Sequence, residues 1–344
     1  MELISQLEKI MNEESPASIK LGLENMTHKL EKEEEVICYP FDNKTLEINR
    51  DFLLEYINNM IEQSGKDRIL FYYERLFKAL TEVKTRKYND INLNRWKEYE
   101  DILTDSLWII KQRDNSGSHS GDYWGNFVPQ IPNQLLRRYT KEGEWVLDPF
   151  LGSGTTLIEA SLLGRNGIGI ELQESVGAIA KKRIDEVSAN DLESKIVIGD
   201  SANVDLDEVM KELGIKKVQF VLMHPPYWDI IRFSEEEACL SNTNSLEGFL
   251  DGFGKVIENT TKYLEKGRFA AVVIGDKYEG GKWVPLGFNV MEEFTKRGFK
   301  LKSIVVKNFE ETKGKRNQRN LWKYRALAGG FYIFKHEYIF IFQK

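Results

Sequence analysis

A strand, a glycine-rich turn and a helix follow one another in Val146–Thr156 (VLDPFLGSGTT), and this order constrains the fold most strongly. In open α/β sheets, a strand of this kind runs into a ligand-binding turn and then into the helix that covers it. Strand-length apolar runs and amphipathic helical patterns alternate from there to the end of the sequence. The alternation predicts an α/β fold with a doubly wound, mostly parallel sheet covered on both faces.

Seven strands are expected in this region, with helices between them. The apolar or β-branched runs that predict strands are residues 144–149, 167–172, 195–200, 218–223, 269–276, 301–306 and 337–342. Helices are expected at residues 155–164, 175–187 and 286–297.

The first 115 residues differ in composition and are rich in Glu, Lys, Leu and Asn. Apolar residues recur at helical spacing in residues 68–81 and 96–111, which predicts two amphipathic helices. A Gly/Ser-rich run at residues 114–122 marks a boundary. We expect a helical N-terminal region over residues 1–115 and a catalytic domain over residues 116–344, with a basic insert at about 307–330.

Bulk composition bounds the function classes. With 41% hydrophobic and 12% aromatic residues, a chain of 344 residues can bury a sizeable core. The net charge of −6 gives no overall positive field, so a nucleic-acid surface has to be local. Cys38 and Cys239 lie far apart and have no metal-ligand spacing, which predicts reduced thiols and no metal. The sequence shows no signal-peptide or membrane-spanning pattern, so we expect a cytoplasmic protein.

The turn after the first strand has the features of a nucleotide site. Gly152 and Gly154 allow close approach of the backbone to a ligand, and Thr155 or Thr156 can cap the next helix. Neither a phosphate-loop lysine nor a G-x-G-x-x-G pattern is present, which argues against a dehydrogenase. Glu171 ends the next strand, where a carboxylate suits ribose hydroxyls. These residues predict a nucleoside-containing cofactor without deciding between a nicotinamide and S-adenosylmethionine.

A resemblance separates these two. DPFLGSGTT resembles motif I of the DNA amino-methyltransferases that modify adenine N6 or cytosine N4, and GIGIEL is similar to their motif II. GNFVPQIPNQLLRRYTKEGEW, from Gly125, resembles motif X, and IGDS resembles motif III. The resemblance implies a class I methyltransferase fold with seven strands and S-adenosylmethionine as cofactor. The cofactor residues it implies are Phe127, Pro129, Asp148, Pro149, Phe150, Gly152, Ser153, Gly154, Thr155, Glu171, Asp200 and Ser201.

The stretch VLMHPPYW, at residues 221–228, resembles motif IV of the same family, (D/N/S/T)-P-P-(Y/F/W). An exocyclic amine is a poor nucleophile because its lone pair is delocalised, and acceptors that hold its hydrogens favour the transition state. The catalytic residues implied are His224, Pro225, Pro226 and Tyr227, with the Pro225 carbonyl as second acceptor. Tyr227, with Trp228 as a further option, is expected to stack on a flipped base.

His224 departs from the family pattern, which has Asp or Asn for adenine and Ser or Thr for cytosine. The methyl acceptor therefore stays open, and the motif order X, I, IV leans slightly to adenine. Two alternatives remain: a merely structural strand-ending turn, or a catalytically silent subunit. Histidine accepts a hydrogen bond only when neutral, so activity is expected to fall on acidification below the ordinary histidine pKa of about 6.5.

A basic stretch at residues 296–325 stands out in this acidic chain. It carries eleven Lys or Arg residues against Glu310 and Glu311 alone. Together with Arg232, it predicts contacts with phosphates, although a solvated loop between two late strands is the alternative. The nucleic-acid residues proposed are Arg232, Lys313, Lys315, Arg316, Arg319, Lys323 and Arg325. Residues 229–248 are expected to fold over the substrate as a lid.

The expected function is site-specific methyl transfer from S-adenosylmethionine to an exocyclic amine in double-stranded DNA with a flipped target base. A place in a restriction-modification or defence system, and a partner subunit or homodimer, fit this expectation. The alternatives are an RNA base amino-methyltransferase and a non-catalytic partner of an active methyltransferase.

Overall fold

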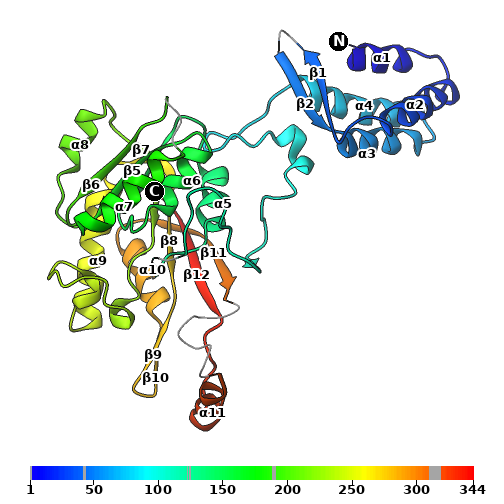
Figure 1. Cartoon of the computed structure of the whole chain (residues 1–344). Helices are drawn as coiled ribbons and strands as arrows, with labels where there is room; N and C mark the ends of the chain where they lie inside the picture. The colour runs from blue at the N-terminus through cyan, green and yellow to red at the C-terminus, as the bar shows by residue number, and fades with distance from the viewer. Residues whose placement is uncertain (1, 42–43, 122, 124, 188–190, 310–318) are drawn as a thin grey trace. The chain divides into compact units, whose positions relative to one another are not determined.

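A computed structural model describes residues 2–41, 44–121, 123, 125–187, 191–309 and 319–344. The chain divides into two compact units (Figure 1). The smaller consists of Met1–Lys87 and Ile91–Ile102, and the larger of Tyr88–Asp90 and Leu103–Lys344. Residues 103–115, which the sequence pattern places in the N-terminal region, therefore belong to the larger unit.

The smaller unit packs helices and one hairpin around its own core. Its elements are α1 (Glu2–Met11), α2 (Pro16–Leu30), the antiparallel pair β1 (Val36–Phe41) and β2 (Lys44–Asn49), α3 (Arg50–Ile61), α4 (Lys66–Thr81) and the 3-10 helix η1 (Leu93–Glu98). Side chains of Ser15 and Asn49 cap α2 and α3. The hairpin shows that this unit is not purely helical.

One of the two predicted N-terminal helices is confirmed and the other is wrong. Helix α4 covers the predicted residues 68–81, and its apolar face is buried. Residues 96–111 instead end η1 and then form the short strand β3 (Leu107–Trp108). Trp108 is 2% exposed and packs into the core of the larger unit, so tertiary packing overrides the helical spacing of the apolar residues.

The larger unit is built on an eight-stranded sheet in the order β3-β11-β12-β8-β7-β4-β5-β6. The seven predicted strands are present, and β3 adds an eighth, parallel to β11. Strands β6, β5, β4, β7 and β8 are parallel, whereas β12 is antiparallel to both of its neighbours. The bounds are β4 (Trp145–Asp148), β5 (Asn166–Glu171), β6 (Ser194–Ile198), β7 (Val218–Met223), β8 (Leu264–Ile274), β11 (Lys300–Asn308) and β12 (His336–Gln343).

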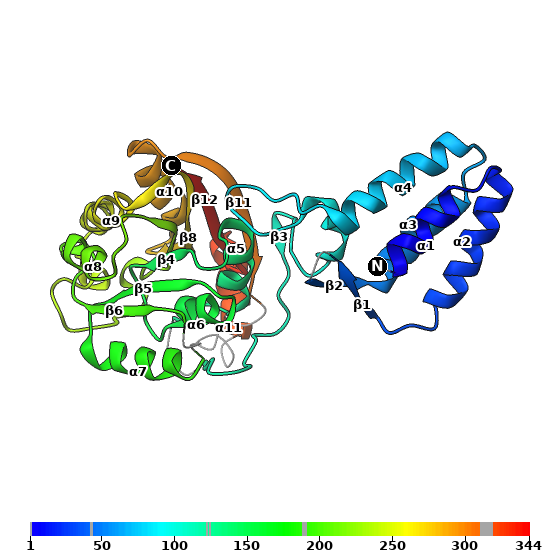
Figure 2. The ribbon, with the colours of Figure 1, turned by 90° about the horizontal axis from the view of Figure 1, so that it is seen from above.

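Helices cover both faces of this sheet, as the alternation predicts (Figure 2). One face packs against α8 (Leu206–Glu212), α9 (Leu246–Thr261) and α10 (Leu286–Lys296). The other packs against α5 (Gln130–Tyr139), α6 (Thr155–Leu162) and α7 (Glu174–Asp185). The chain runs from β4 outward to β5 and β6 and then returns to β7 on the other side of β4. The carboxyl ends of β4 and β7 therefore form the switch point where α/β sheets bind ligands.

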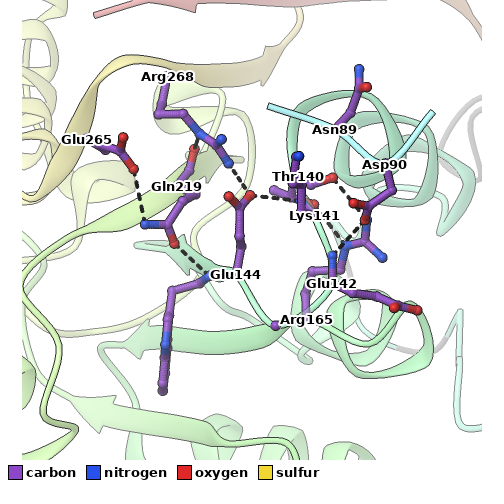
Figure 3. Close-up of polar contacts among 12 residues, drawn as sticks. Asn89, Asp90, Thr140, Lys141, Glu142, Glu144, Arg165, Gln219, Glu265 and Arg268 are labelled. Carbon is purple, nitrogen blue, oxygen red and sulfur yellow. Dashed lines mark hydrogen bonds and ion pairs between the residues drawn. The ribbon is translucent and has the colours of Figure 1, made fainter. Parts of the chain in front are cut away.

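Polar side chains connect the segments at the amino ends of β4 and β7, opposite the switch point (Figure 3). Arg268 is 2% exposed, pairs with Glu144 and donates from Nε to the Gln219 carbonyl over 3.2 Å. Nearby, Arg165 donates to Asp90 over 3.0 Å. The backbone N–H of Glu142 donates to the same carboxylate oxygen over 2.7 Å. These contacts anchor Tyr88–Asp90 in the larger unit.

Cys38 is exposed and Cys239 is buried, and both are free thiols. Within the part of the chain that the structure describes, no helix has the length and apolar character needed to cross a membrane.

Candidate active site

A cavity of about 810 Å³ lies at the carboxyl ends of β4, β5 and β7, where the switch point predicts a ligand site. Its volume falls within the range of about 300–1,000 Å³ typical of small-molecule and cofactor sites. The turn after β4, the end of β5, the HPPY sequence after β7, and the ends of β11 and β12 all contribute side chains to its lining.

The turn after β4 depends on glycine at two positions. Gly152 has φ +51° and Gly154, which precedes α6, has φ +89°. A Cβ at Gly154 would also lie 3.2 Å from the Cβ of Ala180. The amide of Gly152 donates to Oε2 of Glu171 over 2.8 Å. The same glycines that let the chain turn therefore bring the ends of β4 and β5 together.

Eight of the predicted cofactor residues line the cavity: Phe127, Pro149, Phe150, Gly152, Thr155, Glu171, Asp200 and Ser201. The other four, Pro129, Asp148, Ser153 and Gly154, are buried and do not belong to this lining. Asn126, which sequence reasoning missed, lies in the lining and connects two predicted motifs. Its Nδ2 donates to Ser153 Oγ over 2.8 Å, and its Oδ1 accepts from Thr155 Oγ1 over 2.7 Å.

Two acids at the strand ends have different surroundings. Burial raises the pKa of Asp148 to about 7, while its Oδ1 accepts the Phe150 N–H over 2.8 Å. Burial also raises the pKa of Glu171, and the N–H groups of Gln173, Gly152 and Leu172 oppose that shift. A carboxylate has about four acceptor positions. These three backbone contacts leave Glu171 an acceptor position for a ligand in the cavity.

His224 lies at the end of β7, where its ring meets Phe127 edge-on at 4.7 Å and Tyr227 at 5.7 Å between centroids. Burial lowers the pKa of His224 to about 3, and the positive charge of Lys307 adds to the effect. The imidazole is therefore neutral throughout the physiological pH range. The expectation that activity falls near the ordinary histidine pKa has to be corrected, because burial removes that titration from the range.

The two aromatic residues of this sequence have separate environments. Tyr227 lines the cavity, and its hydroxyl donates to Oε2 of Glu337 over 2.8 Å. Its ring packs on Gly275, where a Cβ would lie 2.8 Å from the ring. Trp228 is absent from the lining: the Lys277 ammonium lies 4.2 Å from its ring centroid, and its Nε1 donates to the Thr243 carbonyl over 3.0 Å. Stacking on a base is left to Tyr227 as a prediction.

Lys307 and Glu337 are lining residues that sequence reasoning did not place in the site. Lys307 was counted in the basic stretch, but it is 5% exposed and lies 3.3 Å from Glu337. Its position inside the apolar run of β11 is the signal that marks it as unusual. Arg113 also lines the cavity, donating to the carbonyls of Phe127 and Ser120 over 2.9 and 3.1 Å.

The structure describes some of the remaining basic residues and not others. Lys296 and Arg297 pair with Glu293. Arg232 pairs with Glu235 on the surface. Arg319, Lys323 and Arg325 belong to α11 (Arg319–Gly329), where the side chains of Lys323 and Arg325 are exposed. The predicted residues Lys313, Lys315 and Arg316 lie outside the described residues.

The segment predicted as a lid contributes to the cavity wall. Ile230, Ile231 and Phe233 belong to the lining. A Cβ at Gly125 would lie 2.7 Å from the ring of Phe233, whose carbonyl accepts from Gln173 Nε2 over 3.1 Å. This segment therefore packs against Gly125, the first residue of the stretch that resembles motif X.

Comparison with known proteins fits this geometry. Residues 18–182 match the family described as DNA methylase, and residues 134–231 match the RMKL-like methyltransferase domain. The Type II methyltransferase M.MjaII of Methanocaldococcus jannaschii is 26% identical over 193 residues, 52% of this chain and 34% of the relative. M2.DpnII of Streptococcus pneumoniae is 37% identical over 111 residues, 30% of this chain and 38% of the relative. These similarities support the DNA amino-methyltransferase family for this chain.

A third relative within these similarities acts on RNA by its name. The tRNA (guanine(10)-N2)-dimethyltransferase of M. jannaschii is 37% identical over 104 residues, 30% of this chain and 29% of the relative. The chain spans about a third of the length of the curated relatives it matches. The similarity therefore leaves most of each relative unmatched.

The methyltransferase similarities support S-adenosylmethionine as the cofactor, and the residues present fit it. The remaining acceptor position of Glu171 suits a ribose hydroxyl. Asp200 and Ser201 line the cavity beyond β6, where the resemblance implies contacts with adenine. The strand order with a reversed β12 is that of the class I methyltransferase fold.

Cofactor binding should depend on Glu171. Glu171→Gln removes the charge and one acceptor while keeping the shape, and we expect affinity for S-adenosylmethionine to fall about ten- to hundred-fold, as for a hydrogen bond to a charged group. Calorimetric titration measures this loss. Glu174→Gln, at an exposed position in the first turn of α7, is the matched control and should bind normally. Equal affinities of the two variants would contradict the assignment.

Proposed function

We propose that this chain transfers a methyl group from S-adenosylmethionine to an exocyclic amine in double-stranded DNA. Adenine N6 is favoured slightly over cytosine N4. The observation that carries the proposal is that the turn after β4 and the HPPY sequence after β7 line one and the same cavity. The bound cofactor supplies an electrophilic methyl group. A role in a restriction-modification or defence system, and a partner subunit or homodimer, belong to the same proposal.

The chain's own residues orient the amine in this reaction. His224, a neutral acceptor, and the carbonyl of Pro225 each accept a hydrogen bond from the amine. These two hydrogen bonds direct the nitrogen lone pair toward the methyl carbon. A nitrogen–carbon bond forms as the carbon–sulfur bond breaks, and the nitrogen then releases one proton to water. Tyr227 supports the flipped base by stacking. Arg113, at the motif X end of the cavity, suits the carboxylate of the methionine part.

DNA contact is assigned to α11, Arg232 and the basic residues before α11: Lys313, Lys315, Arg316, Arg319, Lys323 and Arg325. Helix α11 contains no acidic residue, and Tyr324 on it is 69% exposed. The segment after α11 is held to the hairpin of β9 (Lys277–Glu279) and β10 (Lys282–Val284). Phe331 stacks on Tyr278 at 4.1 Å between centroids, and Phe334 packs on Trp283 at 4.3 Å. This basic, aromatic region suits phosphates and base edges.

Charge reversal on α11 should weaken the binding of DNA to this region. In the double variant Lys323→Glu and Arg325→Glu, we expect weaker DNA binding and a salt dependence whose slope falls by about one for each phosphate that the protein no longer neutralises. Fluorescence anisotropy at several salt concentrations measures both quantities. Lys181→Glu and Lys182→Glu, on α7, give the same change in net charge. The assignment fails if both double variants bind alike.

The proposal is tested by incubating the chain with tritiated S-adenosylmethionine and unmethylated double-stranded DNA, followed by nucleoside analysis. N6-methyladenine is expected, and N4-methylcytosine would support the same function with the other base. Unmethylated tRNA is offered in parallel because one relative is named as a guanine N2 enzyme. Methylguanosine without DNA product would select that RNA alternative. Cofactor binding without product on either substrate would select a non-catalytic partner.

The contribution of His224 to the rate should persist in mild acid. The acceptor is the neutral form, which predominates above the His224 pKa of about 3, so protonation removes it only near that value. We expect the ratio of the wild-type rate to that of His224→Asn to be constant from about pH 8 to about pH 5. The Asn amide does not titrate, so the ratio cancels other groups. A ratio that fell about ten-fold in this interval would show an ordinary histidine instead.

A further inference from the structure

We propose that Glu337 and Lys307 are positioning residues that fix the tautomer of His224, and that Tyr227 connects Glu337 to His224. The inference rests on the proposed function for its kinetic consequence. It states how histidine can stand where the family pattern has Asp, Asn, Ser or Thr.

Four side chains from three strand ends form one continuous set of contacts. Lys307 and Glu337 are register partners on β11 and β12. Lys307 Nζ lies 3.3 Å from Oε1 of Glu337, and these side chains are 6% and 5% exposed. Tyr227 donates to Oε2 over 2.8 Å. Nε2 of His224 lies 3.4 Å from the Tyr227 hydroxyl oxygen, a long contact but one with hydrogen-bond geometry.

The direction of these contacts follows from counting protons. Lys307 occupies one carboxylate oxygen of Glu337, and the other oxygen accepts the only hydrogen of the Tyr227 hydroxyl. That hydroxyl oxygen has only lone pairs left for His224. The contact therefore needs a proton on Nε2, which leaves Nδ1 of the neutral ring as the acceptor. Burial and Glu337 raise the Tyr227 pKa well above 10, so the hydroxyl keeps its proton.

The free nitrogen is available to a substrate. Among the described residues, none hydrogen-bonds Nδ1 of His224, and the side chain lines the cavity. With the opposite tautomer, Nδ1 would present an N–H donor to the amine and repel it. A buried ion pair contributes little net stability compared with apolar residues of similar volume. Stability therefore does not explain why the Lys307–Glu337 pair lies behind His224. Selection of the His224 tautomer does.

Nitrogen NMR of the full-length chain tests the tautomer directly. The sequence has four histidines, so ¹⁵N-histidine labelling gives few signals, and the loss of one in His224→Asn assigns His224. We expect the Nε2–H form in the wild type. Glu337→Gln and Tyr227→Phe should each populate the Nδ1–H form, because an amide can donate to the hydroxyl and a phenyl ring accepts nothing there. Lys302→Met, at an exposed position on β11, should leave the spectrum unchanged.

The Nδ1–H form in the wild type would overturn the inference. So would wild-type tautomer signals in both Glu337→Gln and Tyr227→Phe, and two variants guard against one that fails to fold. The kinetic arm expects Glu337→Gln to lower kcat about ten-fold or more with unchanged affinity for S-adenosylmethionine, since groups that set a catalytic histidine tautomer have effects of this size or larger. An unchanged kcat would also overturn it. A wild-type chain without methylated product overturns the proposed function instead, and the NMR result stands independently.

Discussion

Replacement of His224 by phenylalanine is expected to lower the proposed methyl transfer about 10²- to 10³-fold. Phenylalanine fills a similar volume beside Phe127 and removes the only side-chain acceptor that the tetrad offers the amine. Loss of a single group that stabilises developing charge at a reacting centre typically costs this much in kcat. Single-turnover rates with saturating cofactor and DNA measure the loss.

His224→Asn is the matched variant, because its amide oxygen restores an acceptor of the kind found in the family pattern. We expect it to recover activity to within about ten-fold of the wild type. Affinity for S-adenosylmethionine should be the same in both variants, since His224 is proposed to contact the base and not the cofactor. If His224→Phe turned over as fast as the wild type, the carbonyl of Pro225 would have to orient the amine alone.

The turn after β4 and the HPPY sequence could be predicted because their geometry is local. Gly152 and Gly154 adopt positive φ angles within a few residues of the strand that they follow. The alternation of strand and helix then fixes which ends of the parallel strands share an edge. As a result, residues far apart in sequence, such as Gly152 and His224, can be placed in one site from the sequence, and both line the cavity.

The roles of Lys307 and Glu337 could not be predicted in this way. Their pairing depends on the antiparallel register of β11 and β12, which local periodicity does not determine. The charge of Lys307 suggested a phosphate contact, whereas burial and its partner give it a place behind His224. Trp108 is a similar case: its spacing indicates a helix, but the core of the larger unit receives it from a strand. Long-range packing decided both.

At the end of the sheet opposite the cavity, Arg268→Met is expected to destabilise the larger unit by about 3–5 kcal/mol. The substitution removes the buried cation that pairs with Glu144 and leaves this carboxylate without a partner charge. Arg268 is 2% exposed and also donates to the Gln219 carbonyl. Urea titration followed by hydrogen exchange of β8 amides reports on this unit alone. Lys181→Met, which breaks the exposed pair with Asp185, should cost about 0.5 kcal/mol or less. Adding Glu144→Gln to Arg268→Met should restore part of the loss; an undiminished loss would mean that packing of the arginine, not its charge, stabilises this end of the sheet.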